Sequence, residues 1–414
     1  MNILYINHYA GSPEMGMEFR PYYFAREWVK MGHKVTIVAA DFSHLRVKNP
    51  DVSNDFQLQK IDDVQYLWIK TGQYKGNGLA RAFTMAQFIF KLLLKSKWIV
   101  SKFSPDVVIC SSTYPIDTFV GQKICKNSAK KVKLIHEVHD LWPSTLIEVG
   151  GMAKFNPFVL IMQFGENSAY RHSDKVVSLA PLALPYMVKH GLKKEKFVHI
   201  PNGVSKDEWQ NLKDIPIEIK EKILELKRKK LFIVGYIGGH SISNSLDDII
   251  DTADRMRNQK VHFILVGDGI EKERLVNRAT KMKLNNIDFF PPIEKKMIPS
   301  LLKYFDCGFI SALPSPLYKV GTCMNKIFDY MAAGLPIICA ITTPQSQVSE
   351  AKCGICLDSG DIEGIVESVT KLSEMNDEKL NNFSQRGKDA VKNFYTYDKL
   401  AKRFFDIIKE EHIT

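Results

Sequence analysis

The sequence predicts an α/β protein made of two similar domains, each a doubly wound parallel sheet. Three observations lead to this prediction. A buried strand, a glycine-containing loop, a helix and a second buried strand open the chain, with apolar runs at residues 2–8 and 34–40. The same unit returns at nearly the same spacing, with apolar runs at residues 231–237 and 261–266. A length of 414 residues is also too great for one ordinary hydrophobic core.

The boundary between the two domains is expected where the composition changes. Residues 205–230 are charged and helical in character, and they separate two series of apolar runs. We therefore expect a first domain over residues 1–204 and a second domain over residues 205–394. The segment 395–414 carries a final predicted helix, 397–411, which we expect to cross back to the first domain.

Individual elements follow from the apolar runs and from helix stop signals. In the first domain we expect a helix at residues 18–31 and strands at 34–40, 64–69, 107–111, 132–136, 174–179 and 197–200. In the second domain we expect helices at 246–257, 270–282, 296–303 and 325–333, and strands at 231–237, 261–266, 287–290, 307–311 and 337–340. From the end of the strand at 34–40 up to about position 60 the residues are mostly polar and give no clear strand signal.

The composition describes a folded, basic protein of a reducing compartment. Apolar residues make up 45% of the chain, and 57 basic residues against 46 acidic ones give a net charge of +11. The cysteines are scattered through apolar runs; only Cys353 and Cys356 form a C-x-x-C pair, and no second pair supports a zinc or redox role. The first ten residues lack a signal-peptide pattern, and no apolar run is long enough to span a membrane. We therefore expect a cytoplasmic protein.

Residues 79–103 combine many large apolar side chains with basic ones and contain no acidic residue. A basic amphipathic helix that carries Phe and Trp suits the interface of an anionic bilayer. We interpret the segment as a membrane-binding helix. The alternative is a helix that faces the core and keeps its lysines in solvent, and the sequence leaves this alternative open.

The helix at residues 325–333 is the strongest candidate for a binding site. Asn325 is its expected N-cap, and Lys326, Asp329 and Tyr330 share one face, which we expect to be exposed to solvent. A cation beside unpaired amide groups in the first turn of a helix favours a bound phosphate. The alternative is an ordinary surface helix with an ion pair between Lys326 and Asp329.

Two further stretches of the first domain are candidates. Residues 136–140 contain two histidines and two acids at the expected end of a strand, where open α/β sheets place their sites. They lack a third well-spaced metal ligand, so we interpret His139 as a side chain that a neighbouring group orients into a cleft. Gly11 and Gly16 do not have the spacing of a dinucleotide fingerprint, which disfavours a nicotinamide or flavin cofactor. We interpret Gly16 as allowing close approach of a substrate.

The order of the short motifs resembles one known family. GHxVT, HDLWP, PNGV, a strand followed by two glycines, VGDG, NKIFDYMAAGLPII and E-x-x-x-G follow one another along essentially the whole chain. In this order they resemble the retaining glycosyltransferases of family 4, in the branch that builds bacterial surface polysaccharides such as O-antigen, capsule and exopolysaccharide. The resemblance implies the GT-B fold, in which two Rossmann-like domains face a cleft. The first domain would bind the acceptor, and the second would bind a nucleotide-sugar.

The resemblance also implies which residues bind the donor. They are Gly238, Gly239, His240, Asn244, Gly267, Asp268, Gly269, Gly321, Asn325, Lys326, Asp329 and Glu350. Lys326 would neutralise the diphosphate, and Asp329 stands where the family has a glutamate that holds the ribose. Gly321 stands where the family has another glutamate, so this chain departs from the family pattern there, and amide groups of residues 321–325 are the expected substitute.

On the acceptor side the resemblance implies Gly11, Gly16 and Asp140, with His139 near the reacting carbon. The implied catalytic residues are His139, Lys326 and Asp329. Because fixed N–H groups and a lysine stabilise the charge of a leaving diphosphate, and because no D-x-D motif is present, we expect neither a metal ion nor a cofactor.

The expected function is transfer of a sugar, an N-acetylated amino or deoxy sugar, from a UDP-sugar to a lipid-linked saccharide at the inner face of the cell membrane. An alternative is a UDP-N-acetylglucosamine 2-epimerase of the same fold, which would turn over UDP-sugar without an acceptor. A more distant alternative, a protein that binds nucleic acid, would explain the positive charge but would leave the glycine loops without a purpose. We therefore expect no nucleic-acid partner.

Overall fold

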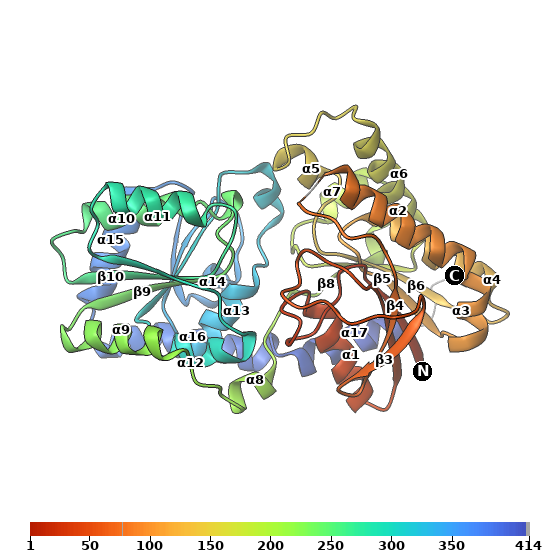
Figure 1. The fold of residues 1–414 in the computed structure, drawn as a ribbon, viewed down its shortest axis with the longest axis horizontal. Coiled ribbons are helices and arrows are strands. Elements are labelled where there is room, and N and C mark those ends of the chain that lie inside the picture. The colour runs from red at the N-terminus through yellow and green to blue at the C-terminus, as the bar shows by residue number, and fades with distance from the viewer. Residues whose placement is uncertain (77, 411–414) are drawn as a thin grey trace. The chain divides into compact units, whose positions relative to one another are not determined.

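The computed structural model describes residues 1–76 and 78–410 (Figure 1). The chain forms two compact units. The first contains residues 1–201 together with the final helix, which begins at Tyr397, and the second contains residues 202–396. The divisions expected from the sequence lie after residues 204 and 394.

The first unit alternates strands with helices. Its elements are β1 Asn2–Ile6, α1 Arg20–Lys30, β2 Lys34–Ala40, β3 Gln57–Ile61, β4 Val64–Ile69, α2 Leu79–Leu94, α3 Ser96–Phe103, β5 Val107–Cys110, α4 Thr118–Asn127, β6 Lys133–Val138, α5 Ser144–Glu148, α6 Pro157–His172, β7 Lys175–Ser178, α7 Leu184–Lys189, β8 Phe197–His199 and α17 Tyr397–Lys409. The strands form one sheet in the order β3-β4-β2-β1-β5-β6-β7-β8. All neighbours pair in parallel except β3, which is antiparallel to β4.

Helices cover both faces of this sheet. Helices α1 and α17 pack together on one face, where Phe24 and Trp28 contact Phe404 of α17, and the indole N–H of Trp28 donates to the carbonyl of Ala401 (3.0 Å). Helices α2, α3 and α4 bury their apolar sides against the other face. The final helix of the chain is therefore part of the core of the first unit.

The second unit has the same α/β architecture, with a sheet of six strands. Its elements are α8 Lys206–Gln210, α9 Ile217–Arg228, β9 Phe232–Ile237, α10 Asp247–Arg255, β10 Val261–Val266, α11 Lys272–Lys281, β11 Ile287–Phe290, α12 Ile298–Leu302, β12 Cys307–Ser311, α13 Asn325–Ala333, β13 Ile337–Ala340, α14 Gln347–Ala351, β14 Gly354–Leu357, α15 Ile362–Ser373 and α16 Asp377–Phe394. Its sheet has the order β11-β10-β9-β12-β13-β14, and every pairing is parallel. Helices α10, α11 and α15 cover one face, and α9, α12, α13 and α16 cover the other (Figure 1).

These two α/β units confirm the predicted fold class, and strands β2, β4, β10, β11, β12 and β13 have the predicted bounds. Three details were predicted wrongly. Strand β3 was not expected, because it is a polar edge strand with both faces largely exposed. The segment 79–103 is not one helix, since α2 ends at Leu94 and α3 begins at Ser96. Met324, not Asn325, is the N-cap of α13. In addition, no helix in the described residues is long and apolar enough to cross a bilayer.

Candidate active-site residues in the two units

Two glycine turns at the ends of β9 and β10 pack directly against each other. The amide of His240 donates to the carbonyl of Asp268 (2.8 Å). A Cβ atom on Gly267 would lie 1.9 Å from the carbonyl oxygen of Gly238, and one on Gly269 would lie 2.3 Å from that of His240. Because no side chain fits at either position, these glycines allow the two turns to meet at the carboxyl edge of the sheet. The structure thus brings together the residues 238–240 and 267–269 that the sequence analysis selected.

Lys326 lies over the first of these turns. Its ammonium group donates to the hydroxyl of Tyr236 (2.9 Å) and to the side-chain oxygen of Asn244 (3.3 Å), and it lies 4.2 Å from the centre of the Tyr236 ring. A Cβ atom on Gly238 would be 3.3 Å from the same nitrogen. Burial lowers the pKa of Lys326 to about 7, and no carboxylate pairs with it among the described residues. This desolvated cation is therefore available to an anionic ligand.

Tyr236 is a residue of this site that the sequence analysis did not select. Its hydroxyl accepts from Lys326 and donates to the carbonyl of Gly239 (2.7 Å), and the side-chain amide of Asn244 donates to the same carbonyl (2.9 Å). The signal in the sequence was a side chain with a polar tip inside an otherwise apolar strand. Tyr236 and Asn244 together hold both the turn and the lysine in place.

His240 is buried beside this cluster. Its ring lies between those of Tyr236 and Phe289, with centroid distances of 6.0 and 6.2 Å. Neither ring nitrogen has a hydrogen-bond partner among the described residues. Burial, assisted by the charges of Lys272 and Lys326, lowers the pKa of His240 to about 4, so the ring is neutral at physiological pH.

Asp329 does not lie on a solvent-exposed face with Lys326, and that expectation is wrong. Its carboxylate is buried and accepts two hydrogen bonds from Lys295 Nζ, at 2.8 and 2.7 Å. The reason is that α13 packs against α12 and α16 as well as the sheet, so both of its faces are covered beyond the first turn. Burial lowers the pKa of Lys295, but the charges of Asp329 and Glu208 raise it by more. Tyr330, expected on the same exposed face, is also buried.

The other predicted donor-side residues lie around the start of α13 and on α14. Gly321 has φ = +88° and follows a 3₁₀ turn, and its amide donates to the carbonyl of Tyr318 (3.1 Å), so this amide already has a partner. Asn325 is exposed at the first position of α13. Glu350 is exposed on α14, where its carboxylate accepts from Gln345 and from the hydroxyl of Tyr395 (3.4 Å).

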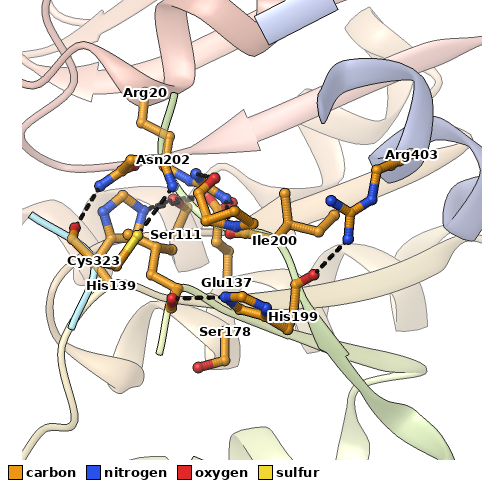
Figure 2. A network of polar contacts seen from close by, with 12 residues as sticks. Arg20, Ser111, Glu137, His139, Ser178, His199, Ile200, Asn202, Cys323 and Arg403 are labelled. Atoms are coloured by element: carbon orange, nitrogen blue, oxygen red, sulfur yellow. Dashed lines mark hydrogen bonds and ion pairs between the residues drawn. The ribbon is translucent and has the colours of Figure 1, made fainter. Parts of the chain in front are cut away.

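In the first unit, His139 belongs to a network that starts at the end of β6 (Figure 2). Its Nε2 lies 2.8 Å from Ser111 Oγ and 3.3 Å from Glu137 Oε2, and its Nδ1 lies 3.7 Å from a carboxylate oxygen of Glu18. Burial lowers the pKa of His139, but the hydrogen bond to Glu137 and the charges of Glu18 and Glu137 raise it above its usual value. The imidazole is therefore held in one orientation and retains a proton readily.

Glu137 is the neighbouring group that orients the imidazole. It is wholly buried and accepts from Arg20 (3.0 Å), Tyr5 (2.5 Å) and Ser111 (2.7 Å). Burial raises the pKa of Glu137, whereas the ion pair with Arg20 and the hydrogen bonds from His139 and Tyr5 lower it by more, so the carboxylate stays ionised. Arg20 is fixed in turn by the carbonyls of Ile200 (2.9 Å) and Pro201 (2.6 Å) (Figure 2). Neither Glu137 nor Arg20 was among the site residues predicted from the sequence.

The predicted acceptor-side glycines serve the packing of their own loop. A Cβ atom on Gly11 would lie 1.8 Å from the carbonyl oxygen of Met17, and one on Gly16, where φ is +94°, would lie 2.8 Å from the side chain of Val47. The backbone conformation of Gly16 and its contact with Val47 therefore explain why a glycine stands there, without a substrate. Asp140 follows His139 and is exposed.

Two family models match the chain, one in each unit. The model described as Glycosyltransferase Family 4 matches residues 15–208, and the model described as Glycosyl transferases group 1 matches residues 217–390. The chain belongs to family 4 of the glycosyltransferases. This assignment confirms the resemblance seen in the motifs.

A curated relative of this glycosyltransferase is the protein named colanic acid biosynthesis glycosyl transferase WcaI of Escherichia coli. It is 26% identical over 208 residues, which are 49% of this chain and 50% of the relative, so the match spans half of the length of that protein.

Solved structures confirm the GT-B fold of the glycosyltransferase. Sucrose-phosphate synthase of Thermosynechococcus elongatus superposes with a TM-score of 0.74 at 13% identity, covering 98% of both chains. HepE of Anabaena, solved in complex with UDP and glucose, gives a TM-score of 0.66 at 14% identity, covering 99% of this chain and 100% of HepE. At such identities the likeness concerns the fold alone.

Proposed function

We propose that this glycosyltransferase moves a sugar from a UDP-sugar to a lipid-linked saccharide during bacterial surface polysaccharide synthesis. The observation that carries the proposal is the half-buried ammonium group of Lys326, which has no carboxylate partner in the described residues and lies over the glycine turn at Gly238. The WcaI relative and the UDP complexes of HepE support the choice of pathway and of nucleotide. The transferred sugar is proposed to be an N-acetylated amino sugar or a deoxy sugar.

On the donor side, the chemistry needs stabilisation of a leaving diphosphate. Lys326 lies in the first turn of α13, where the amide groups of a helix are unpaired and the helix dipole is positive. Breaking the sugar–phosphate bond increases the negative charge on the diphosphate, and a fixed cation with fixed N–H groups stabilises that charge without reorganising. We propose that the diphosphate binds here and that the reaction needs no metal ion or cofactor.

On the acceptor side, we propose that His139 acts next to the reacting carbon. The ion pair of Glu137 with Arg20 fixes the imidazole, and the raised pKa of His139 lets it hold a proton and donate a hydrogen bond. We propose that the acceptor hydroxyl attacks from the face that the diphosphate leaves and passes its proton to the departing phosphate. This route retains the configuration of the sugar and requires no carboxylate nucleophile.

Membrane binding belongs to the proposal because helices α2 and α6 expose large apolar side chains in the first unit. Phe83 and Phe90 on α2 are 69% and 62% exposed, and Phe164 on α6 is 68% exposed. Helix α4 lies between α2 and α6, and Phe119 of α4 stacks on Phe164 with a centroid distance of 5.8 Å. We call the exposed apolar side chains of α2 and α6 the apolar face. They are Leu79, Phe83, Phe90 and Leu94 with Leu160, Ile161 and Phe164.

Basic side chains accompany the apolar face. Lys95 and Lys97 are exposed beside α2, and Lys123 and Lys126 are exposed on α4, whereas Lys91 is paired with Asp55 (2.6 Å). The opposite side of α2 is buried in the core of the unit. The buried side of α2 is thus a core-facing side, and we propose that its exposed side binds the inner face of an anionic membrane.

Calorimetric titration of the purified protein with UDP, GDP, dTDP and ADP, in the presence of a chelator, tests the donor site. We expect one nucleotide, UDP, to bind selectively, and Lys326→Ala to weaken its binding at least tenfold. Lys303→Ala removes an exposed lysine of the same unit and is the matched control, with unchanged affinity. Equal affinity of Lys326→Ala and the control would refute the donor site.

A further inference from the structure

The C-x-x-C pair of the sequence is not a pair in the structure. Cys353 precedes β14, is buried and lies with its thiol 3.9 Å from the carbonyl of Val348. Cys356 lies on β14, directly opposite Cys339 of the parallel neighbour β13. Residues directly opposite each other on adjacent strands project from the same face of the sheet. The partner of Cys356 is therefore Cys339, which is 17 residues earlier in the chain.

The two thiols differ in exposure and in acidity. Cys356 is exposed, and Cys339 is buried. A hydrogen bond with the Cys339 thiol lowers the pKa of Cys356 to about 7, and Ser346 Oγ, 3.7 Å from its sulfur, contributes in the same direction. The same contact and burial raise the pKa of Cys339. Near neutral pH the pair consists of an accessible thiolate and a protonated thiol beneath it, the arrangement that peroxide-sensitive cysteines use.

The geometry of the strands permits a covalent bond between the two side chains. Neighbouring strands lie about 4.8 Å apart, and disulfides span Cα separations of about 4.4–6.8 Å. Strand β14 is the edge of its sheet, so only β13 restrains it laterally through backbone hydrogen bonds. A small movement of this edge strand adjusts the distance between the sulfurs.

We propose that Cys356 and Cys339 form a peroxide-sensitive dithiol that closes to a disulfide between β14 and β13. In the first step the Cys356 thiolate attacks a peroxide oxygen of H₂O₂, the O–O bond breaks, and Cys356 sulfenic acid and hydroxide form. In the second step the sulfur of Cys339 attacks the sulfenic sulfur, its proton goes to the departing hydroxide, and water leaves. In total two thiols and one H₂O₂ give one disulfide and two waters.

The other cysteines do not share this environment. Burial raises the pKa of Cys353 to about 12 and that of Cys125 to about 11. Cys110 and Cys307 are wholly buried. The sulfur of Cys323 accepts a hydrogen bond from the amide of Asn202 (3.1 Å). Oxidation is therefore expected to be selective for Cys356.

Peptide mapping of the full-length protein, treated with H₂O₂ and digested without reductant, tests the proposal. We expect a linked peptide that joins Cys339 to Cys356 and that dithiothreitol releases. In Cys339→Ser we expect no linked peptide and a sulfenic acid at Cys356 that dimedone traps. Cys353→Ser is the matched control and should form the disulfide as the wild type does. A Cys353–Cys356 link, or oxidation that never yields the Cys339 link, would overturn the proposal.

A second measurement does not depend on disulfide closure. The rate at which iodoacetamide alkylates Cys356 follows its thiolate fraction. We expect a midpoint near pH 7 in the wild type, as the pKa of about 7 implies, and a midpoint at least one pH unit higher in Cys339→Ala, which removes the hydrogen-bond donor. Identical midpoints in the two proteins would show that Cys339 does not act on Cys356, and the proposal would then be wrong.

Discussion

Asp329 and Lys295 form a buried pair in which one ammonium group donates to both oxygens of one carboxylate. They come from α13 and from the turn after β11, and 34 residues separate them in the chain. The pair therefore ties the helix that carries Lys326 to a neighbouring loop of the same unit. Its burial makes Asp329 a structural residue as well as a proposed donor-side residue.

The first prediction follows from this burial. Removing one member of a buried ion pair leaves the other charge without a partner, which costs about 3–5 kcal/mol. We expect Lys295→Met to lower the free energy of unfolding by about this amount and the double variant Lys295→Met/Asp329→Asn to recover much of it. Urea denaturation measures both. Lys227→Met is the control, because Lys227 and Asp306 form a similar two-bond pair that is about one-third exposed, and we expect it to cost about 1 kcal/mol or less.

The proposed contact of Asp329 with the ribose needs a separate test. Both of its oxygens already accept from Lys295, so a ribose hydroxyl would have to use the remaining lone pairs. If Asp329 makes this contact, the wild type should bind UDP more tightly than 2′,3′-dideoxy-UDP, and Asp329→Asn should bind the two with nearly equal affinity. Discrimination that survives in Asp329→Asn would assign the ribose contact to another residue.

The second prediction concerns pH. In the free protein the pKa of Lys326 is about 7, and a bound diphosphate raises it, because an adjacent negative charge favours the protonated amine. Affinity for a UDP-sugar should therefore fall as the pH rises above about 7, by up to about tenfold for each pH unit. A UDP-sugar is the suitable ligand because its diphosphate charge is constant over this range. The slope should disappear in Lys326→Met, and a wild-type affinity that is independent of pH would contradict the proposed contact.

The third prediction separates chemistry from donor binding. His139→Ala should lower kcat by about 10²-fold to 10⁴-fold, the usual contribution of a positioned acid or base, and leave the affinity for UDP nearly unchanged. Glu137→Gln keeps the size of the side chain and removes the charge that supports the imidazolium, so the pKa of His139 should fall in an NMR titration. A loss confined to KM in His139→Ala, or an unchanged His139 pKa in Glu137→Gln, would count against these roles.

The fourth prediction tests the apolar face. Phe83→Ser/Phe164→Ser should reduce flotation with vesicles that contain phosphatidylglycerol, because each exposed ring contributes apolar area to the interface. Phe394→Ser removes a ring that is 58% exposed on α16 of the second unit and should float as the wild type does. High salt should weaken binding of the wild type. Equal flotation with neutral vesicles, or no flotation of the wild type, would remove the membrane from the proposal.

The sequence predicted the buried strands well and the polar pairs poorly, because an apolar run is a local pattern and the two members of a polar pair are often far apart in the chain. A strand such as Val261–Val266 is covered on both faces, so its apolar run is a local signal. Strand Gln57–Ile61 lies at an edge and is largely exposed, and its composition has no such run.

Polar partners across the fold leave no local signal. From the sequence, Lys326 was a possible ion-pair partner of Asp329, because it lies three positions away on the same helix. In the structure the partner of Asp329 is Lys295, which is distant in the chain. Likewise Glu137 could be noted as a carboxylate beside His139, but its ion pair with Arg20 spans 117 residues. The glycine turns at the ends of β9 and β10 could be predicted as turns, because two glycines and a strand end already form a local pattern.

Helix α17 has a consequence for the order in which the protein is completed during synthesis. The second unit is continuous in sequence, so it can fold as soon as Thr396 has left the ribosome. The first unit is translated earlier but lacks its last helix, and Phe24 and Trp28 keep an uncovered aromatic surface until Phe404 arrives. The first unit is therefore translated first but completes its fold last. If translation stalls before α17 is synthesised, the uncovered aromatic side chains of α1 can bind chaperones or other chains.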